Sequence, residues 1–132
     1  MKNIEEYLKE NGVKPSYQRI KIFEYLIKNK NHPKVETIFQ ELVQEIPTLS
    51  KTTVYNTLKL FLEKGIVQPI LIEENEVRYD ADITTHAHFK CEKCGEVYDF
   101  RVNLSQLKIE GLEEFQVKES RIYFKGICKK CL

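Results

Sequence analysis

The sequence predicts an α+β fold in two parts, a winged-helix domain over residues 1–83 and a small α+β domain over residues 84–132 with a structural zinc site. Two observations predict this arrangement. Helical periodicity continues to residue 65 and is followed by a hairpin pattern, whereas beyond residue 83 the chain changes to short β-type runs and two cysteine pairs. Because a domain of about 50 residues buries little apolar surface, the second part needs a metal ion, a partner subunit or both.

Four amphipathic segments precede residue 65 and predict helices. Residues typical of helix starts stand at three of them, with Ser16 and Ser50 as caps and Pro33 in a first turn, and Gly65 follows the last. In the third segment the apolar positions continue to Ile46, directly before Pro47. The expected helices run from 4 to 10, 15 to 28, 33 to 46 and 50 to 64.

The remaining elements are predicted from short runs of β-branched and aromatic residues. Residues 66–72 and 77–79 flank a polar turn at 73–76 and predict a β-hairpin, the wing. After residue 83 the expected elements are a short helix near 104–109 and strands at 87–90, 97–100, 115–118 and 122–127.

One face of the predicted helix 50–64 carries hydroxyl, amide and ammonium groups and no acid. Its residues follow helical spacing and are Thr52, Tyr55, Asn56 and Lys59. Such groups can hydrogen-bond to base edges and phosphates in a DNA major groove, although an ordinary exposed stripe can have the same composition. Lys14 and Arg19 belong to the stretch 14–34, which has six basic residues and one acid. That stretch is typical either of a phosphate-contacting patch or of a solvated helix face.

All four cysteines fall in two pairs with a two-residue spacer, Cys91 with Cys94 and Cys128 with Cys131. This spacer lets both thiolates of a tight turn bind one ion, and two such turns complete the tetrahedron that Zn(II) prefers. Four thiolates leave no open coordination position, so the predicted zinc is structural rather than catalytic. Disulfides are disfavoured in a reducing cytosol, and a redox pair of the thioredoxin type would not account for the second pair.

The three histidines and three aspartates of the chain are concentrated near the first cysteine pair. Five of the six lie between residues 80 and 99, and the sixth, His32, precedes a predicted helix. His86 and His88 on one strand project to the same face. Imidazoles and carboxylates without thiolate suit Fe(II), Mn(II) or Zn(II) with more than four ligands. From these residues alone, a set of unrelated surface groups remains the other interpretation.

The order of these motifs resembles that of the ferric uptake regulator family over essentially the whole chain. The landmarks are Gln18-Arg19, His32-Pro33, Thr53-Val54-Tyr55, Arg78-Tyr79-Asp80, His86-x-His88-x2-Cys91-x2-Cys94 and Cys128-x2-Cys131. Within the family the chain is most similar to the peroxide-responsive branch, because the position of Asp99 usually holds glutamate in iron-sensing members and aspartate in peroxide sensors. No cysteine is left over for the additional ligand that zinc-sensing members commonly recruit. The histidine-rich run before the cysteines is sparer than in typical iron sensors.

This resemblance implies a metal-dependent repressor, not an enzyme, that binds a palindromic operator in double-stranded DNA as a homodimer. The regulatory Fe(II) or Mn(II) would take five ligands and favour the conformer that matches successive major grooves. In the peroxide branch bound Fe(II) reacts with hydrogen peroxide and a ligand histidine is oxidised, which makes His32 and His86 the candidate targets, while the zinc thiolates take no part. The implied regulatory ligands are His32, Asp80, His86, His88 and Asp99.

Three other functions share some of these features. A zinc nucleobase deaminase needs a histidine two residues before a glutamate that acts as general acid, but the corresponding stretch here is His86-Ala87-His88. An initiation factor with a winged helix and a zinc ribbon would hold no sensor metal and would not need three clustered histidines. An iron-sensing regulator without a peroxide response is the nearest alternative.

Composition predicts a cytoplasmic protein without a membrane span. The apolar runs are only a few residues long, and residues 1–15 lack the apolar segment and cleavage site of a secretory signal. The net charge of +1 argues against a uniformly basic nucleic-acid-binding surface. Any DNA contact is therefore expected from the local basic stretch and from the polar helix face.

Overall fold

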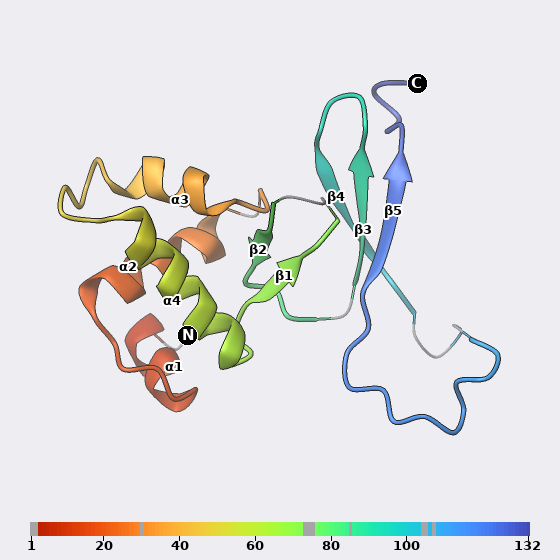
Figure 1. Ribbon diagram of the computed structural model, residues 1–132, viewed down its shortest axis with the longest axis horizontal. Helices are drawn as coiled ribbons and strands as arrows, with labels where there is room; N and C mark the ends of the chain where they lie inside the picture. Colours follow the sequence, from red (N-terminus) through yellow and green to blue (C-terminus); the bar gives the residue numbers. More distant parts are fainter. Residues whose placement is uncertain (1–2, 30, 73–75, 85, 104–105, 107) are drawn as a thin grey trace. The chain divides into compact units, whose positions relative to one another are not determined.

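The computed structural model describes residues 3–29, 31–72, 76–84, 86–103, 106 and 108–132 (Figure 1). The chain divides into two compact units, Met1–Ile83 and Thr84–Leu132, here called the N-terminal and C-terminal units. Helices and a two-stranded sheet make up the first, and a three-stranded sheet makes up the second. No helix among the described residues is long and apolar enough to cross a membrane.

The described residues of the N-terminal unit contain four helices, and three of these begin at a side-chain cap. The Asn3 side chain accepts from Glu6 N, Ser16 accepts from Arg19 N, and Ser50 accepts from Thr53 N. Such caps satisfy N–H groups that have no partner inside the helix. The helices are α1 (Ile4–Glu10), α2 (Tyr17–Lys28), α3 (Val35–Leu42) and α4 (Lys51–Glu63).

The apolar faces of these helices meet in one core. The Phe23 ring stacks on Tyr7 at a centroid distance of 5.4 Å and meets the edge of Phe61 at 5.5 Å. Burial of each large apolar side chain contributes roughly 1.5–3 kcal/mol, and the completely buried ones are Leu8, Ile22, Ile38, Val54, Leu58 and Phe61.

The third helix is shorter than the sequence predicts. α3 ends at Leu42, and a turn over residues 43–45 carries the chain to Ile46, which is buried in the core as expected but lies beyond the helix. Pro47 opposes continuation of the helix, because it has no N–H to donate to the Val43 carbonyl and because Ile46, which precedes it, is disfavoured in helical backbone conformation.

The wing is a short antiparallel pair, β1 (Gln68–Ile70) and β2 (Arg78–Asp80), in which Gln68 pairs with Asp80 and Ile70 with Arg78. β1 lies within the predicted run 66–72, and β2 overlaps the predicted run 77–79 and extends one residue beyond it. Most of the expected turn, residues 73–75, lies outside the described residues. Four helices followed by this pair give the winged-helix architecture.

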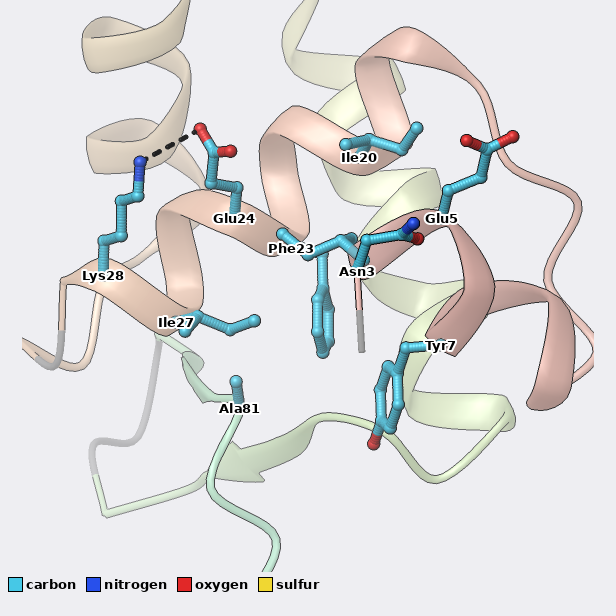
Figure 2. A pocket seen from close by; sticks show the side chains of 10 residues that line it. Asn3, Glu5, Tyr7, Ile20, Phe23, Glu24, Ile27, Lys28 and Ala81 are labelled. Atoms are coloured by element: carbon cyan, nitrogen blue, oxygen red, sulfur yellow. Dashed lines mark ion pairs between the residues drawn. The ribbon is translucent and has the colours of Figure 1, made fainter. Parts of the chain in front are cut away.

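An apolar pocket of about 800 Å³ opens between α1 and α2. Figure 2 shows Tyr7, Phe23 and Ile27 around it, with the ion pair between Glu24 and Lys28 at one side. Its other lining residues are Asn3, Ile4, Glu5, Ile20 and Ala81. Among the described residues that line this pocket there is no histidine or cysteine.

The C-terminal unit is a sheet with strand order β4-β3-β5, built from β3 (His86–Cys91), β4 (Val97–Arg101) and β5 (Ile122–Gly126). β3 pairs antiparallel with β4 and parallel with β5. Since side chains alternate along a strand, the pairing of His88 with Asp99 and Tyr123 puts these three on one face. Phe100 and Phe124 lie on the opposite face, because they pair with Ala87 and Phe89.

One predicted strand of this unit is not formed, and one predicted helix lies partly outside the described residues. Residues 115–118 were expected to form a strand, and this is wrong: they form a bend and irregular backbone, with Phe115 69% exposed. Their alternating side chains suit a strand, but a strand forms only where another strand satisfies its backbone groups. The short helix expected near 104–109 falls on a segment in which residues 104, 105 and 107 lie outside the described residues.

Candidate metal centres and nucleic-acid interface

The four cysteines converge in the C-terminal unit. Their sulfur atoms all lie within 4.8 Å of one another, and the Sγ atoms of Cys94 and Cys128 are 3.8 Å apart. Cys91 ends β3 and is completely buried, whereas Cys94 is exposed. Gly95 completes the first turn with a positive φ of 78°, and its N–H donates to the Cys91 carbonyl. This conformation is the one that glycine adopts without a steric cost.

Hydrogen bonds prepare part of this cluster for the thiolate form. The backbone N–H groups of Cys94 and Cys128 each donate to Cys91 Sγ at 3.4 Å, which lowers the pKa of Cys91 to about 6. In contrast, Cys131 donates its thiol hydrogen to the Cys128 sulfur, which raises the pKa of Cys131 to about 12. The metal-free cluster therefore favours some thiolates and opposes a full set, and a bound divalent cation would remove that opposition.

A tyrosine and a lysine support the second pair. The Tyr98 hydroxyl donates to Glu96 at 2.7 Å, and because it can donate to the Cys128 sulfur instead, it lowers the pKa of that thiol. Lys130 forms an ion pair with the same Glu96 carboxylate at 3.1 Å. These groups orient the second pair and place positive charge beside it.

The cysteine cluster fits Zn(II). Four thiolates at the usual Zn–S distance of about 2.3 Å form a tetrahedron with edges of about 3.8 Å. The measured separation between the Cys94 and Cys128 sulfurs equals that edge. With four sulfur donors and no other group in the cluster, the ion would be held for structure rather than for catalysis.

His86, His88 and Asp99 come together on one face of the C-terminal sheet. The Nε2 atoms of His86 and His88 lie 3.7 Å and 3.3 Å from Asp99 Oδ1. Both histidines are buried, and their ring centroids are 4.4 Å apart. His86 Nδ1 lies 2.7 Å from the Thr84 carbonyl oxygen, so that contact orients the ring and leaves Nε2 directed at Asp99.

His32 and Asp80 lie in the N-terminal unit, in two segments that are tied together. Tyr79 N donates to the Pro33 carbonyl at 3.0 Å, and Arg78 Nη1 donates to the His32 carbonyl at 3.5 Å. Both His32 and Asp80 are buried, and one Asp80 carboxylate oxygen accepts from Asp82 N at 2.9 Å. His32 has a positive φ of 53°, which is uncommon for a residue other than glycine. Such backbone is kept where the surrounding structure imposes it, often at ligand sites.

The donor set of these five residues suits Fe(II) or Mn(II). It consists of three buried imidazoles, the buried Asp80 carboxylate and the exposed Asp99 carboxylate, without a thiolate, which matches borderline and hard divalent ions. Neighbouring ligands of a six-coordinate ion lie roughly 3 Å apart. The distances from Asp99 to the two histidines are close to that value.

The predicted DNA-contacting residues lie on α4 and at the start of α2. Tyr55 is 52% exposed, and Thr52, Asn56 and Lys59 are also exposed on the same face of α4. Arg19 donates through Nη1 to the Lys14 carbonyl at 2.8 Å, so the side chain is held against the segment that leads into α2.

The chain matches the ferric uptake regulator family over residues 10–125. It is 33% identical over 127 residues to the peroxide-responsive repressor PerR of Staphylococcus aureus, with 94% of this chain and 86% of that protein covered. The chain belongs to the ferric uptake regulator family. Its fold is similar to that of the ferric uptake regulator from Francisella tularensis with iron, with a TM-score of 0.77, 25% identity and coverage of 91% and 95% of the two chains. It is also similar to PerR from Streptococcus pyogenes, with a TM-score of 0.56, 31% identity and coverage of 98% and 91%.

As a member of this family, the protein is a metal-dependent transcription regulator and not an enzyme. The match confirms the predicted α+β fold class and the resemblance drawn from the motifs. It also excludes the deaminase and the initiation factor as alternatives.

Sequence reasoning missed the residues that orient the ligands. The Thr84 carbonyl, the Tyr98 hydroxyl and the contacts of Arg78 with the His32 loop act through the backbone or across strands. Tyr98 had a weak signal, because it occupies an alternate position in a predicted strand next to Asp99. Arg78 was named only as part of a family landmark, and the Thr84 carbonyl had no signal, since a carbonyl oxygen is common to all residues.

Proposed function

We propose that the protein is a metal-dependent repressor, acting in the cytoplasm, that binds palindromic operator DNA as a homodimer and senses hydrogen peroxide. Residues 1–83 form its winged-helix DNA-binding domain, and residues 84–132 form its dimerisation and metal-binding domain. Structural Zn(II) binds to Cys91, Cys94, Cys128 and Cys131. Regulatory Fe(II) or Mn(II) binds to His32, Asp80, His86, His88 and Asp99.

The convergence of His86 and His88 on one oxygen of Asp99 carries this proposal most directly. Two buried imidazole nitrogens directed at one carboxylate oxygen form a set of ligand atoms that one divalent cation can bridge. His32 and Asp80 belong to the N-terminal unit and the other three to the C-terminal unit. An ion that takes ligands from both would couple metal binding to the arrangement of the units, with a coupling of typically 1–3 kcal/mol.

Dimerisation is supported by the face of the C-terminal sheet opposite the histidines. Phe100 and Phe124 lie on this face, and each is 54% exposed. Exposed aromatic side chains on the sheet of so small a unit are typical of a surface that associates with a second copy. A dimer would present two α4 helices to a palindromic site.

Peroxide sensing is supported by Asp99, by the relatives named PerR and by the candidate targets His32 and His86. Bound Fe(II) supplies the redox chemistry that activates peroxide beside these imidazoles. In the net reaction one oxygen atom of hydrogen peroxide replaces the hydrogen on an imidazole carbon and gives the hydroxylated ring or its oxo tautomer, and the other oxygen leaves as water. An oxidised imidazole is a poorer ligand, so the metal and then the DNA are released.

Metal analysis tests the function as a whole. We expect one tightly held zinc per chain and a second, exchangeable equivalent of Fe(II) or Mn(II), and operator affinity should rise when the second equivalent binds. The measurement combines metal content with DNA binding by fluorescence anisotropy, using an operator selected from a random library. Protein with full zinc whose DNA affinity ignores added Fe(II) and Mn(II) would contradict the sensor assignment.

Tyr55→Ala is expected to weaken operator binding roughly tenfold to a hundredfold while leaving fold and dimer intact. Tyr55 is exposed in the middle of the polar face of α4, so its loss removes contacts to base edges and costs no core packing. Thr52→Ala should act in the same direction. Operator titrations check the affinity, and thermal unfolding checks the fold.

Lys14→Ala is the contrasting variant. It should weaken specific and non-specific DNA to similar extents and reduce the salt slope by about 1, because an ammonium group that contacts phosphate reads no sequence. If Tyr55→Ala retains full operator affinity, the recognition surface lies elsewhere on the domain.

Iron sensing without a peroxide response is the second candidate. It is favoured by the similarity to the ferric uptake regulator from Francisella tularensis with iron. Both candidates require Fe(II)-dependent DNA binding, and only the peroxide sensor requires a modified histidine.

A further inference from the structure

A polar notch of about 590 Å³ lies between the start of α2 and one face of α4, next to the face proposed to read bases. Nine residues line it, and none of them is acidic. From the start of α2 come Lys14, Pro15, Ser16, Gln18 and Arg19, and from α4 come Thr53, Asn56, Thr57 and Leu60. Both helices also lack an acid in their first turn.

The start of α2 supplies hydrogen-bond donors and positive charge to this notch. At the start of α2 the Ser16 side chain accepts from Arg19 N, whereas the N–H groups of the first two helical residues have no partner within the helix. The helix dipole adds partial positive charge at the same point. Arg19 is held there through one nitrogen by the Lys14 carbonyl, which leaves its other N–H groups available.

Thr57 is a nearly buried polar residue of the notch. Only 6% of the residue is exposed, and yet it lines this polar cavity. Within the described part of the chain, no hydrogen bond to its hydroxyl is formed. The hydroxyl oxygen is not among the fully enclosed, unpartnered polar atoms, so it can be reached from the notch and can donate to a ligand there.

We propose that this notch is a seat for one phosphodiester of the DNA backbone. The inference rests on the proposed DNA binding and assigns a different task to each side of α4. Thr53, Asn56 and Thr57 line the notch, whereas Thr52 and Tyr55, each about 100° around the helix from its C-terminal neighbour, do not. Asn56 therefore stands at the boundary between the two sides. A phosphate held in the notch fixes how deeply and in which register α4 enters the groove, without reading sequence.

The test uses Thr57→Val, which keeps the shape of the side chain and removes the hydroxyl. We expect the affinity for DNA to fall roughly tenfold for each notch that contacts the duplex, because a hydrogen bond to a charged acceptor is lost. The loss should be the same for the operator and for a duplex of mixed sequence. The salt slope should stay unchanged, since threonine carries no charge. The melting temperature should change little, because no hydrogen bond within the protein is lost.

Thr52→Val is the matched control, with the same chemical change on the same helix outside the notch. Its effect should depend on the base sequence. A scan of operators with single methylphosphonates locates the seat: in each half-site one substitution should cost the wild-type protein about tenfold and Thr57→Val much less. If Thr57→Val does not fold, Gln18→Ala replaces it as the test variant. Gln18 also lines the notch, so its loss should reduce the contribution of the same phosphate to the DNA-binding affinity.

The outcomes separate this inference from the proposed function. If the wild-type protein binds no duplex, the DNA-binding function itself fails. If it binds and Thr57→Val shows the same affinity and the same methylphosphonate profile, the notch is not a phosphate seat. If inorganic pyrophosphate stabilises the wild type but not Thr57→Val while DNA binding is unchanged, the notch holds a small anion and the DNA assignment is overturned.

Discussion

Cys91→Ser is expected to release the zinc ion, unfold the C-terminal unit and abolish the dimer. Cys91 is completely buried and accepts two backbone N–H bonds at its sulfur, so serine would leave both donors and the ion poorly satisfied. Structural zinc in small domains contributes on the order of 10 kcal/mol of apparent binding free energy, which exceeds the total stability of a unit this small. Metal content, circular dichroism and sedimentation measure the three consequences.

The matched control for this prediction is Lys129→Ser. Lys129 is exposed between the two cysteines of the second pair, so the same residue type is introduced next to the cluster without loss of a sulfur ligand. This variant should keep one zinc per chain and remain dimeric. A Cys91→Ser protein that still forms a stable dimer, or wild-type protein purified without zinc, contradicts the structural role of the cluster.

Iron-loaded protein treated anaerobically with a small excess of hydrogen peroxide is expected to lose operator binding. A peptide containing His32 or His86 should gain about one oxygen mass, ~16 Da, since the metal-generated oxidant acts only on side chains at the ion. His86 is held with Nε2 toward Asp99, and His32 is held in a constrained loop, so both imidazoles stay near the proposed ion. Peptide mass spectrometry and DNA binding follow the two events in the same sample.

Manganese-loaded and metal-free protein are the controls and should show no mass gain. Asp99→Glu keeps a carboxylate ligand but lengthens its reach, which shifts the ion relative to the histidines. We expect metal-dependent DNA binding to survive in this variant and peroxide sensitivity to fall. Unmodified histidines in an iron-loaded protein whose DNA binding still responds to Fe(II) would favour the iron-sensing function instead.

Much of the fold follows from local patterns in the sequence. The starts of α2 and α4, the strands of the wing and the pairing of cysteines around a two-residue spacer depend on residues close to one another in the chain. Helical periodicity, capping and short ligand spacing are properties of such neighbours. They were therefore predictable, as was the α+β class that the family match confirms.

Only the tertiary structure decided which of these residues meet. The register between β3 and β4 places Asp99 opposite His88 rather than one position away, and a shift of one residue would turn that carboxylate to the other face. The contact between the His32 loop and β2, and the notch around Thr57, likewise join segments far apart in the sequence. Residues 115–118 have the alternation of a strand and form none, because a strand needs a partner whose position no local pattern contains.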